Sequence, residues 1–192
     1  MRTMSDTSEQ ILDTAEALIL RGGFHAFSFQ DIAERIGIKK ASIYYHHPAK
    51  AELGRAVIAR YRRRFKEVMA AIEEDRGIGY WEALDLYMEP IVQLARSDDE
   101  MCLCGVLGGE YLALPEAMQA EVAAFFGEHQ KWLAKLLERG RKAGEFHFTG
   151  SPGKTAKLAF SAIEGALLIK RATRDAGQFD DVMALIKAML RG

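Results

Sequence analysis

Residues 28–48 read SFQDIAERIGIKKASIYYHHP, and this pattern predicts two short helices joined by a tight turn at Gly37. Ser28 and Asp31, three positions apart, are the residue types that cap the start of a helix. Apolar residues at helical spacing then give the first helix one buried face: Phe29, Ile32, Ala33 and Ile36. Gly37 stands where a left-handed residue ends a helix, so the stretch predicts a helix-turn-helix.

The second predicted helix, over residues 39–46, has little apolar surface. Pro48 bounds it, because helical geometry is disfavoured for the residue in front of a proline. Burial is expected only for Ala41, Ile43 and part of Tyr44. An outward position is expected for Lys39, Lys40, Ser42 and Tyr45. A short helix with so little to bury is typical of one whose exposed side contacts a partner.

The segment GIKKASIYYHHPAK at 37–50 resembles the recognition-helix segment of TetR-family transcriptional regulators. The similarity extends upstream through RGGFHAFSFQDIAERIG and covers roughly the first 60 residues. Two positions depart from the family pattern: Lys39 replaces a capping Ser or Thr, and His47 replaces a Phe. The resemblance implies an all-α fold, with an N-terminal three-helix DNA-binding domain and a C-terminal helical bundle for ligand binding and dimerisation.

The candidate DNA contacts lie on and around the second helix. Lys40 and Ser42 are placed to reach base edges. Tyrosines, a histidine and a lysine are better suited to phosphate contacts, and Lys50 resembles the family's phosphate-contacting lysine. The whole predicted set is Ser28, Lys39, Lys40, Ser42, Tyr44, Tyr45, His46 and Lys50. The arginines at 60 and 62–64 are interpreted as a solvated helix face.

Charge is distributed unevenly along the chain. Residues 1–66 carry 12 Lys and Arg against 7 Asp and Glu, a net charge of +5, and residues 67–192 carry 14 against 20, a net charge of -6. The basic part contains the helix-turn-helix, as binding to a phosphate backbone requires. No apolar run approaches membrane-spanning length and the N-terminus lacks the apolar core of a signal peptide, so a cytoplasmic protein is expected.

Periodicity predicts a helix in each of the remaining long segments. The expected helices cover about residues 7–22, 48–75, 80–94, 101–114, 115–141, 152–169 and 179–190. Thr7 with Gln10 is expected to cap the first, and Ser151 with Pro152 to open the helix after residue 150. We divide the chain into a DNA-binding domain (1–48), a linking helix (49–75) and a ligand-binding and dimerisation domain (76–192). The sequence leaves open whether Met1 or Met4 is the native start.

The C-terminal part offers aromatic and polar side chains that could line a ligand pocket or fill the core equally well. They are Tyr87, Cys104, Tyr111, Phe125, His129, Trp132, Phe160 and Glu164. Neither a metal site nor a cofactor site is predicted. His129 with Glu164 leaves a small helical enzyme as an alternative.

The two cysteines, Cys102 and Cys104, are too few for a disulfide framework. Two positions apart on a helix, they would point about 200° away from each other. They are expected to be small buried hydrophobes. The alternative is a thiol sensor at Cys102, because some regulators of this kind carry a reactive cysteine in a similar segment. The acidic residues at 98–100 count against a reactive thiolate there.

The function predicted from these features is a ligand-responsive transcriptional regulator, a repressor by resemblance, that binds a palindromic double-stranded DNA operator. One recognition helix contacts few base pairs, so a two-fold dimer is expected. The resemblance places the homodimer interface on residues 116–141 and 154–172. The effector, the operator and the direction of regulation remain open at this point.

Overall fold

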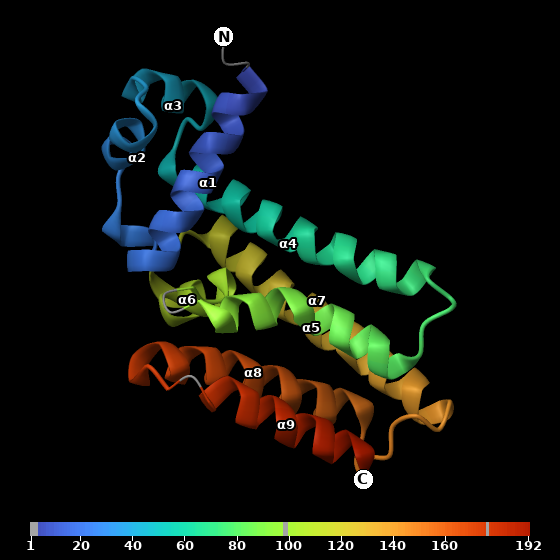
Figure 1. The fold of residues 1–192 in the computed structure, drawn as a ribbon. Coiled ribbons are helices and arrows are strands. Elements are labelled where there is room, and N and C mark those ends of the chain that lie inside the picture. The colour runs from blue at the N-terminus through green and yellow to red at the C-terminus, as the bar shows by residue number, and fades with distance from the viewer. Residues whose placement is uncertain (1–3, 98–99, 176) are drawn as a thin grey trace. The chain divides into compact units, whose positions relative to one another are not determined.

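The computed structural model describes residues 4–97, 100–175 and 177–192, and the regular elements within those residues are all helical (Figure 1). The all-α prediction is confirmed. The chain divides into two compact units, one of Met1–Arg63 with Leu103–Ala124 and one of Arg64–Cys102 with Phe125–Gly192. Helices α4 (Lys50–Glu74) and α7 (Glu116–Lys142) each contribute residues to both units.

The first unit contains α1 (Met4–Gly22), α2 (Phe29–Ile36), α3 (Lys40–His46) and α6 (Leu103–Gly109), with two short 3-10 turns, η1 (Phe24–Ala26) and η2 (Tyr111–Ala113). Its core is built from apolar side chains on every one of its helices, including Ile11, Ile19, Phe24, Ile32, Ile43, Val57, Leu107 and Met118. The predicted capping pair of α1 is wrong: the helix begins at Met4, so Thr7 lies inside it.

A long-range contact holds the turn after α1 in place. The backbone N–H of Phe24 donates to Glu110 Oε2 at 3.0 Å, and His25 Nε2 lies 3.1 Å from the carbonyl oxygen of Ala113. The φ of 85° at Gly23 favours glycine, and a Cβ there would lie 1.6 Å from Glu110 Oε1 and displace that carboxylate. The segment after residue 102 therefore completes the N-terminal unit.

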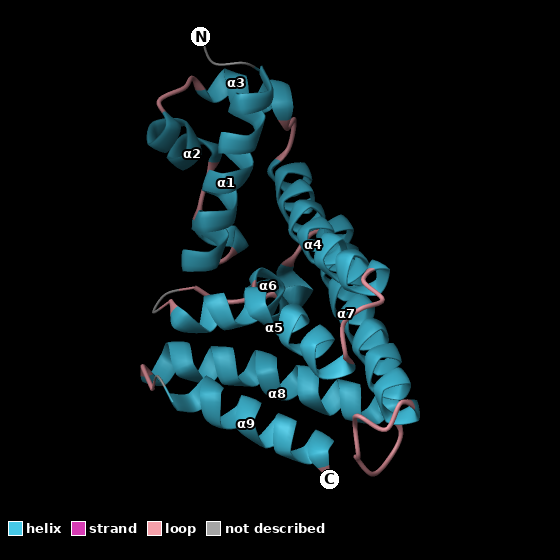
Figure 2. Cartoon of the chain, turned by 45° about the vertical axis from the view of Figure 1, so that its right-hand side comes forward, coloured by secondary structure: helices cyan, strands magenta, loops and turns pink. Residues whose placement is uncertain are grey.

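The second unit contains α5 (Tyr80–Arg96), α8 (Pro152–Thr173) and α9 (Gly177–Arg191), with the later parts of α4 and α7. Helices α8 and α9 run antiparallel and side by side (Figures 1 and 2). The predicted start of α8 is confirmed, because Ser151 Oγ accepts from the Lys154 N–H at 3.3 Å and Pro152 opens the helix. None of the described helices combines the length and apolarity that a bilayer crossing requires.

Two predicted helix boundaries are corrected by the structure. The linking helix begins at Lys50 and not at Pro48, which lies in the turn after α3. The single helix predicted over 101–114 is α6, of only seven residues, followed by the separate turn η2. Glycine is a poor helix former, and α6 ends at the pair Gly108 and Gly109. Within the predicted acidic connection, Asp98 and Asp99 lie outside the described residues.

Candidate nucleic-acid interface

The start of α2 is capped as predicted. The backbone N–H and the hydroxyl of Ser28 both donate to Asp31 Oδ2, at 2.6 and 2.7 Å. These hydrogen bonds from Ser28 hold the pKa of Asp31 below its usual value, so the capping carboxylate stays ionised. Ser28 is itself exposed at the N-terminal end of α2.

The turn between α2 and α3 depends on Gly37. Its φ of 68° is in the left-handed region, and the N–H groups of Gly37 and Ile38 both donate to the carbonyl oxygen of Ala33. This geometry ends α2 and reverses the chain, as the sequence predicts. The turn therefore fixes the direction in which α3 leaves α2.

Helix α3 is held by one fully buried side chain, Ile43. Ala41 is exposed, so the expectation of its burial is wrong. Tyr44 is half-exposed, with its ring 4.9 Å from that of Phe29 in an edge-on contact. Tyr45 is 72% exposed. Most of the surface of α3 is thus free to contact a partner.

The stretch of sequence that contains α3 carries basic residues and lacks acidic ones. Residues 35–50 include Arg35, Lys39, Lys40 and Lys50 and contain neither Asp nor Glu. Lys39 and Lys40 are exposed at the N-terminal end of α3, and Lys40 Nζ lies 5.8 Å from the centre of the Tyr44 ring. The helix and its cap bring together six of the predicted contacts: Lys39, Lys40, Ser42, Tyr44, Tyr45 and His46. Such a helix can place donors on both phosphates and base edges.

Lys50 differs from the α3 residues because its side chain covers two buried aromatic rings. Its Nζ lies 4.4 Å from the centre of the Phe27 ring and 4.7 Å from that of Phe24, at cation–π distance. Burial lowers the pKa of Lys50, while Asp31 and Glu110 act in the opposite direction. The aromatic rings therefore orient this lysine at the first turn of α4.

Arg60 and Arg62 are not part of the solvated face that the sequence suggested, whereas Arg63 and Arg64 are exposed as expected. Arg60 is 8% exposed, and its guanidinium makes ion pairs with Glu9 at 2.9 Å and with Asp13 and Glu16 at 2.8 Å. Arg62 pairs with Glu121. Sequence reasoning missed the Arg60 cluster, although the three acids recur at helical spacing on α1 and so mark one acidic face.

Six of the eight residues suggested for a ligand pocket belong to the second unit. They are Tyr87, Phe125, His129, Trp132, Phe160 and Glu164. Five of them form an aromatic cluster, in which the Tyr87 hydroxyl lies 2.7 Å from His129 Nδ1 and the Tyr87 ring stacks on Trp132 at 4.6 Å. Cys104 and Tyr111 belong to the first unit.

Burial shifts the pKa values of two polar groups in the second unit, His129 and Glu164, toward their neutral forms. Burial lowers the pKa of His129 to about 3 and raises that of Glu164 to about 7. A hydrogen bond from Cys102 to the Glu164 carboxylate partly opposes the second shift. Within the residues that the structure describes, no group of three or more side chains could hold a metal ion.

Both cysteines are free and buried. Cys102 precedes α6 and Cys104 lies within it, so the predicted 200° separation on one helix does not apply. A buried thiol that donates to a carboxylate is a poor nucleophile, because reactivity requires exposure and a nearby cation. The arrangement favours structural cysteines.

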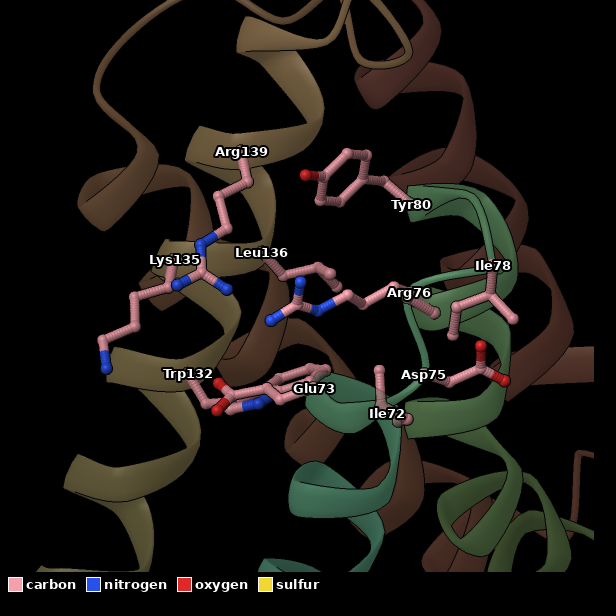
Figure 3. A pocket seen from close by; sticks show the side chains of 11 residues that line it. Ile72, Glu73, Asp75, Arg76, Ile78, Tyr80, Trp132, Lys135, Leu136 and Arg139 are labelled. Atoms are coloured by element: carbon pink, nitrogen blue, oxygen red, sulfur yellow. The ribbon is translucent and has the colours of Figure 1, made fainter.

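A cavity of about 360 Å³ lies elsewhere in the second unit (Figure 3). It is lined by Ile72, Glu73, Asp75, Arg76, Ile78, Tyr80, Ala83, Trp132, Lys135, Leu136 and Arg139. Of the residues suggested from the sequence, only Trp132 lines it. The lining comes from the end of α4, the following loop, the start of α5 and one face of α7, so no single stretch of sequence could have revealed it.

Comparison with known proteins places these features in a family. Residues 11–57 match the family model for bacterial regulatory proteins of the tetR family. The crystal structure of a TetR-family transcriptional regulator from Agrobacterium tumefaciens is similar over 98% of this chain and 100% of that one, with a TM-score of 0.90 and 30% sequence identity. A TetR regulator from Legionella pneumophila is 33% identical, with a TM-score of 0.85 over 96% of this chain and 97% of that one.

A curated relative is similar to this chain over nearly its whole length. The HTH-type transcriptional repressor NemR of Escherichia coli K12 is 25% identical over 98% of this chain and 96% of its own. Such regulators bind DNA, are typically dimeric, respond to small molecules and are not enzymes. The helix-turn-helix, the helical second unit and the full-length similarities lead to one conclusion: this chain belongs to the TetR family of bacterial transcriptional regulators.

Proposed function

We propose that this chain is a repressor that binds a palindromic operator as a homodimer and is released when a small molecule binds its C-terminal part. The observation that carries the proposal is α3, a basic helix held by the single buried residue Ile43 with most of its other side chains available to DNA. In this proposal residues 1–48 form the domain that contacts DNA, and residues 76–192 form the domain that binds the effector and the second copy. Residues 49–75 form the helix that links these two domains. Its site of action is the cytoplasm, where chromosomal DNA is found.

Exposed apolar side chains on α8 and α9 support a dimer interface there. Leu158, Leu168, Ile169 and Leu185 are 61, 57, 46 and 70% exposed. Large hydrophobic side chains exposed on two adjacent helices suit a self-complementary two-fold interface. The resemblance suggested α8 together with α7, but no large hydrophobic side chain on described α7 reaches comparable exposure. We therefore propose that α8 and α9 of each copy form the interface.

The route from effector to DNA is helix α4, because it contributes residues to both compact units and follows directly after α3 in the chain. An effector that changes the position of α4 in each subunit would change the separation of the two α3 helices. Half-sites must match this separation, about 34 Å or a multiple of it. A coupling of about 1 to 3 kcal/mol would change operator affinity roughly 5 to 150-fold.

Fluorescence anisotropy with DNA flanking the chain's own gene tests the proposal. Lys40→Ala should loosen preference at one base position by about 1 to 3 kcal/mol, and Lys50→Ala should weaken binding to all sequences and lower the salt slope by about one unit. Arg63→Ala is the matched control, because it removes an exposed charge from α4 about 20 Å along the helix from Lys50. Equal binding of flanking and random duplexes by the wild-type protein would refute the proposal.

Thiol sensing through Cys102 is the alternative mechanism of release. Its support is weaker, because Cys102 is 3% exposed and its thiol donates to Glu164. If mild thiol oxidation abolished DNA binding and Cys102→Ser prevented that loss, the thiol mechanism would replace the small-molecule one.

A further inference from the structure

We propose that the cavity at the C-terminal end of α4 binds an organic monoanion, a flat apolar body with one carboxylate, and that this anion is the effector. The inference rests on the proposed function above, and it names the chemical class of the molecule that releases DNA. It follows from which polar groups of the cavity lack partners.

Two guanidinium groups face each other across the cavity. Figure 3 shows the side chains of Arg76, from the loop after α4, and Arg139, from α7, pointing toward one another, with Lys135 on the same side as Arg139. Among the described residues no hydrogen bond or ion pair involves these three side chains, although Glu138 interacts electrostatically with Arg139. All three cations are exposed, and arginine stays protonated at any working pH, so both guanidinium groups would attract an anion placed between them.

The indole of Trp132 supplies a further donor without an acceptor. Trp132 is 8% exposed, and its Nε1 is buried without a hydrogen-bond partner. A buried N–H left unpaired is unfavourable, and an acceptor oxygen on a bound molecule would satisfy it. Trp132 lines the cavity, so this unpaired N–H belongs to its wall and is already removed from water.

The carboxylates of the cavity do not neutralise its three cations. Asp75 Oδ1 accepts from the Gly77 N–H at 2.8 Å, and Figure 3 shows the Asp75 carboxylate on the far side of the loop from the Arg76 guanidinium. Glu73 is the remaining carboxylate of the lining, and it is exposed. Three cations against two carboxylates leave a net charge of +1, which matches a monoanion better than a phosphate ester with two charges.

The shape and the apolar walls indicate the rest of the ligand. Ile72, Ile78, Ala83 and Leu136 contribute aliphatic surface, and Trp132 contributes an aromatic ring. A volume of about 360 Å³ is near the lower end of the range for small-molecule sites, which suits a ligand of one or two rings. The lining joins the last turn of α4 to α7, so a bound anion would hold the end of the helix that leads to the DNA-binding residues.

Isothermal titration calorimetry of the full-length protein with 2-naphthoate tests the site, with neutral 2-naphthamide and 2-naphthyl phosphate as matched probes. The naphthoate should bind at least tenfold more tightly than the amide and more tightly than the phosphate. Arg76→Gln and Arg139→Gln should each weaken naphthoate binding about tenfold. Lys131→Gln, which removes an exposed charge one helical turn from Lys135, should leave it unchanged.

Glu73→Gln should have the opposite effect on naphthoate affinity. It removes a carboxylate that repels the anion, so naphthoate binding should tighten severalfold. Equal binding of the amide, unchanged affinity in both arginine variants, or no naphthoate binding would overturn the anion site. Tighter phosphate binding would overturn the monoanion assignment. Operator binding measured without naphthoate tests the proposed regulator function separately. Naphthoate that binds the cavity yet leaves operator affinity unchanged would overturn the effector role alone.

Discussion

The ion cluster at Arg60 should be a main source of stability for the N-terminal unit. The Arg60 side chain is 9% exposed, and its partners differ in exposure: Glu16 is 12% exposed, whereas Glu9 and Asp13 are 59 and 68% exposed. The bond to Glu16 is thus a buried charge-assisted hydrogen bond, worth about 1.5 to 3 kcal/mol. The two exposed pairs add about 0.2 to 1 kcal/mol each. Arg60→Ala should therefore lower the free energy of unfolding by about 3 kcal/mol.

Urea unfolding followed by far-ultraviolet circular dichroism, at one fixed protein concentration, measures this loss. For a chain of this size, a loss of about 3 kcal/mol corresponds to a fall in Tm of roughly 6 to 12 °C. Arg63→Ala on the same helix, where the side chain is exposed, should change stability by less than about 0.5 kcal/mol. If Arg60→Ala cost less than about 1 kcal/mol, the assignment of Arg60 as a buried anchor between α4 and α1 would be wrong.

Three further changes test the second unit. Burial raises the pKa of Glu164 from 4.5 to about 7, so this carboxyl's contribution to stability is present below pH 4.5 and lost as the pH rises to 7. Glu164→Gln should remove that loss. By about pH 8 its free energy of unfolding, measured with urea, should exceed that of wild type by up to about 3 kcal/mol. Leu168→Asp should shift the protein to monomers in analytical ultracentrifugation and weaken operator binding; an intact dimer would contradict the α8–α9 interface. Gly140→Ala should lower thermal stability by about 1 to 3 kcal/mol, because its Cβ would lie 2.3 Å from Phe146, whereas Gly127→Ala on the same helix meets no close atom and should not destabilise.

Local signals in the sequence were sufficient for most helix starts and for the helix-turn-helix. The pair Ser28 and Asp31, the left-handed Gly37 and the Ser151 cap each act within a few residues, so their geometry follows from residue type and spacing. The segment after Cys102 was harder to predict. Its apolar residues suggested one helix, but the glycine pair ends α6 and a separate turn follows.

Long-range contacts lay beyond this kind of reasoning. The sequence shows an acidic face on α1 and an arginine cluster on α4, but only the packing of α1 against α4 makes them partners. The cavity is an extreme case, because Arg76 and Arg139 are more than 60 positions apart and face each other only after α4, α5 and α7 have packed. Patterns along the chain predict the elements, whereas sites built from several elements depend on tertiary structure.

The bond between Glu110 and the Phe24 N–H affects how the protein matures. During translation, Phe24 leaves the ribosome well before Glu110, its partner 86 positions later, has been synthesised. Until then the turn after α1 lacks its acceptor, and Gly54 lacks the Met118 side chain that packs against it. A truncated product ending at residue 63 would keep the helix-turn-helix sequence but would lack the contacts made by Glu110 and Met118. Nascent DNA-binding segments are therefore incomplete until most of the chain exists, which disfavours operator occupancy by fragments that carry no sensor.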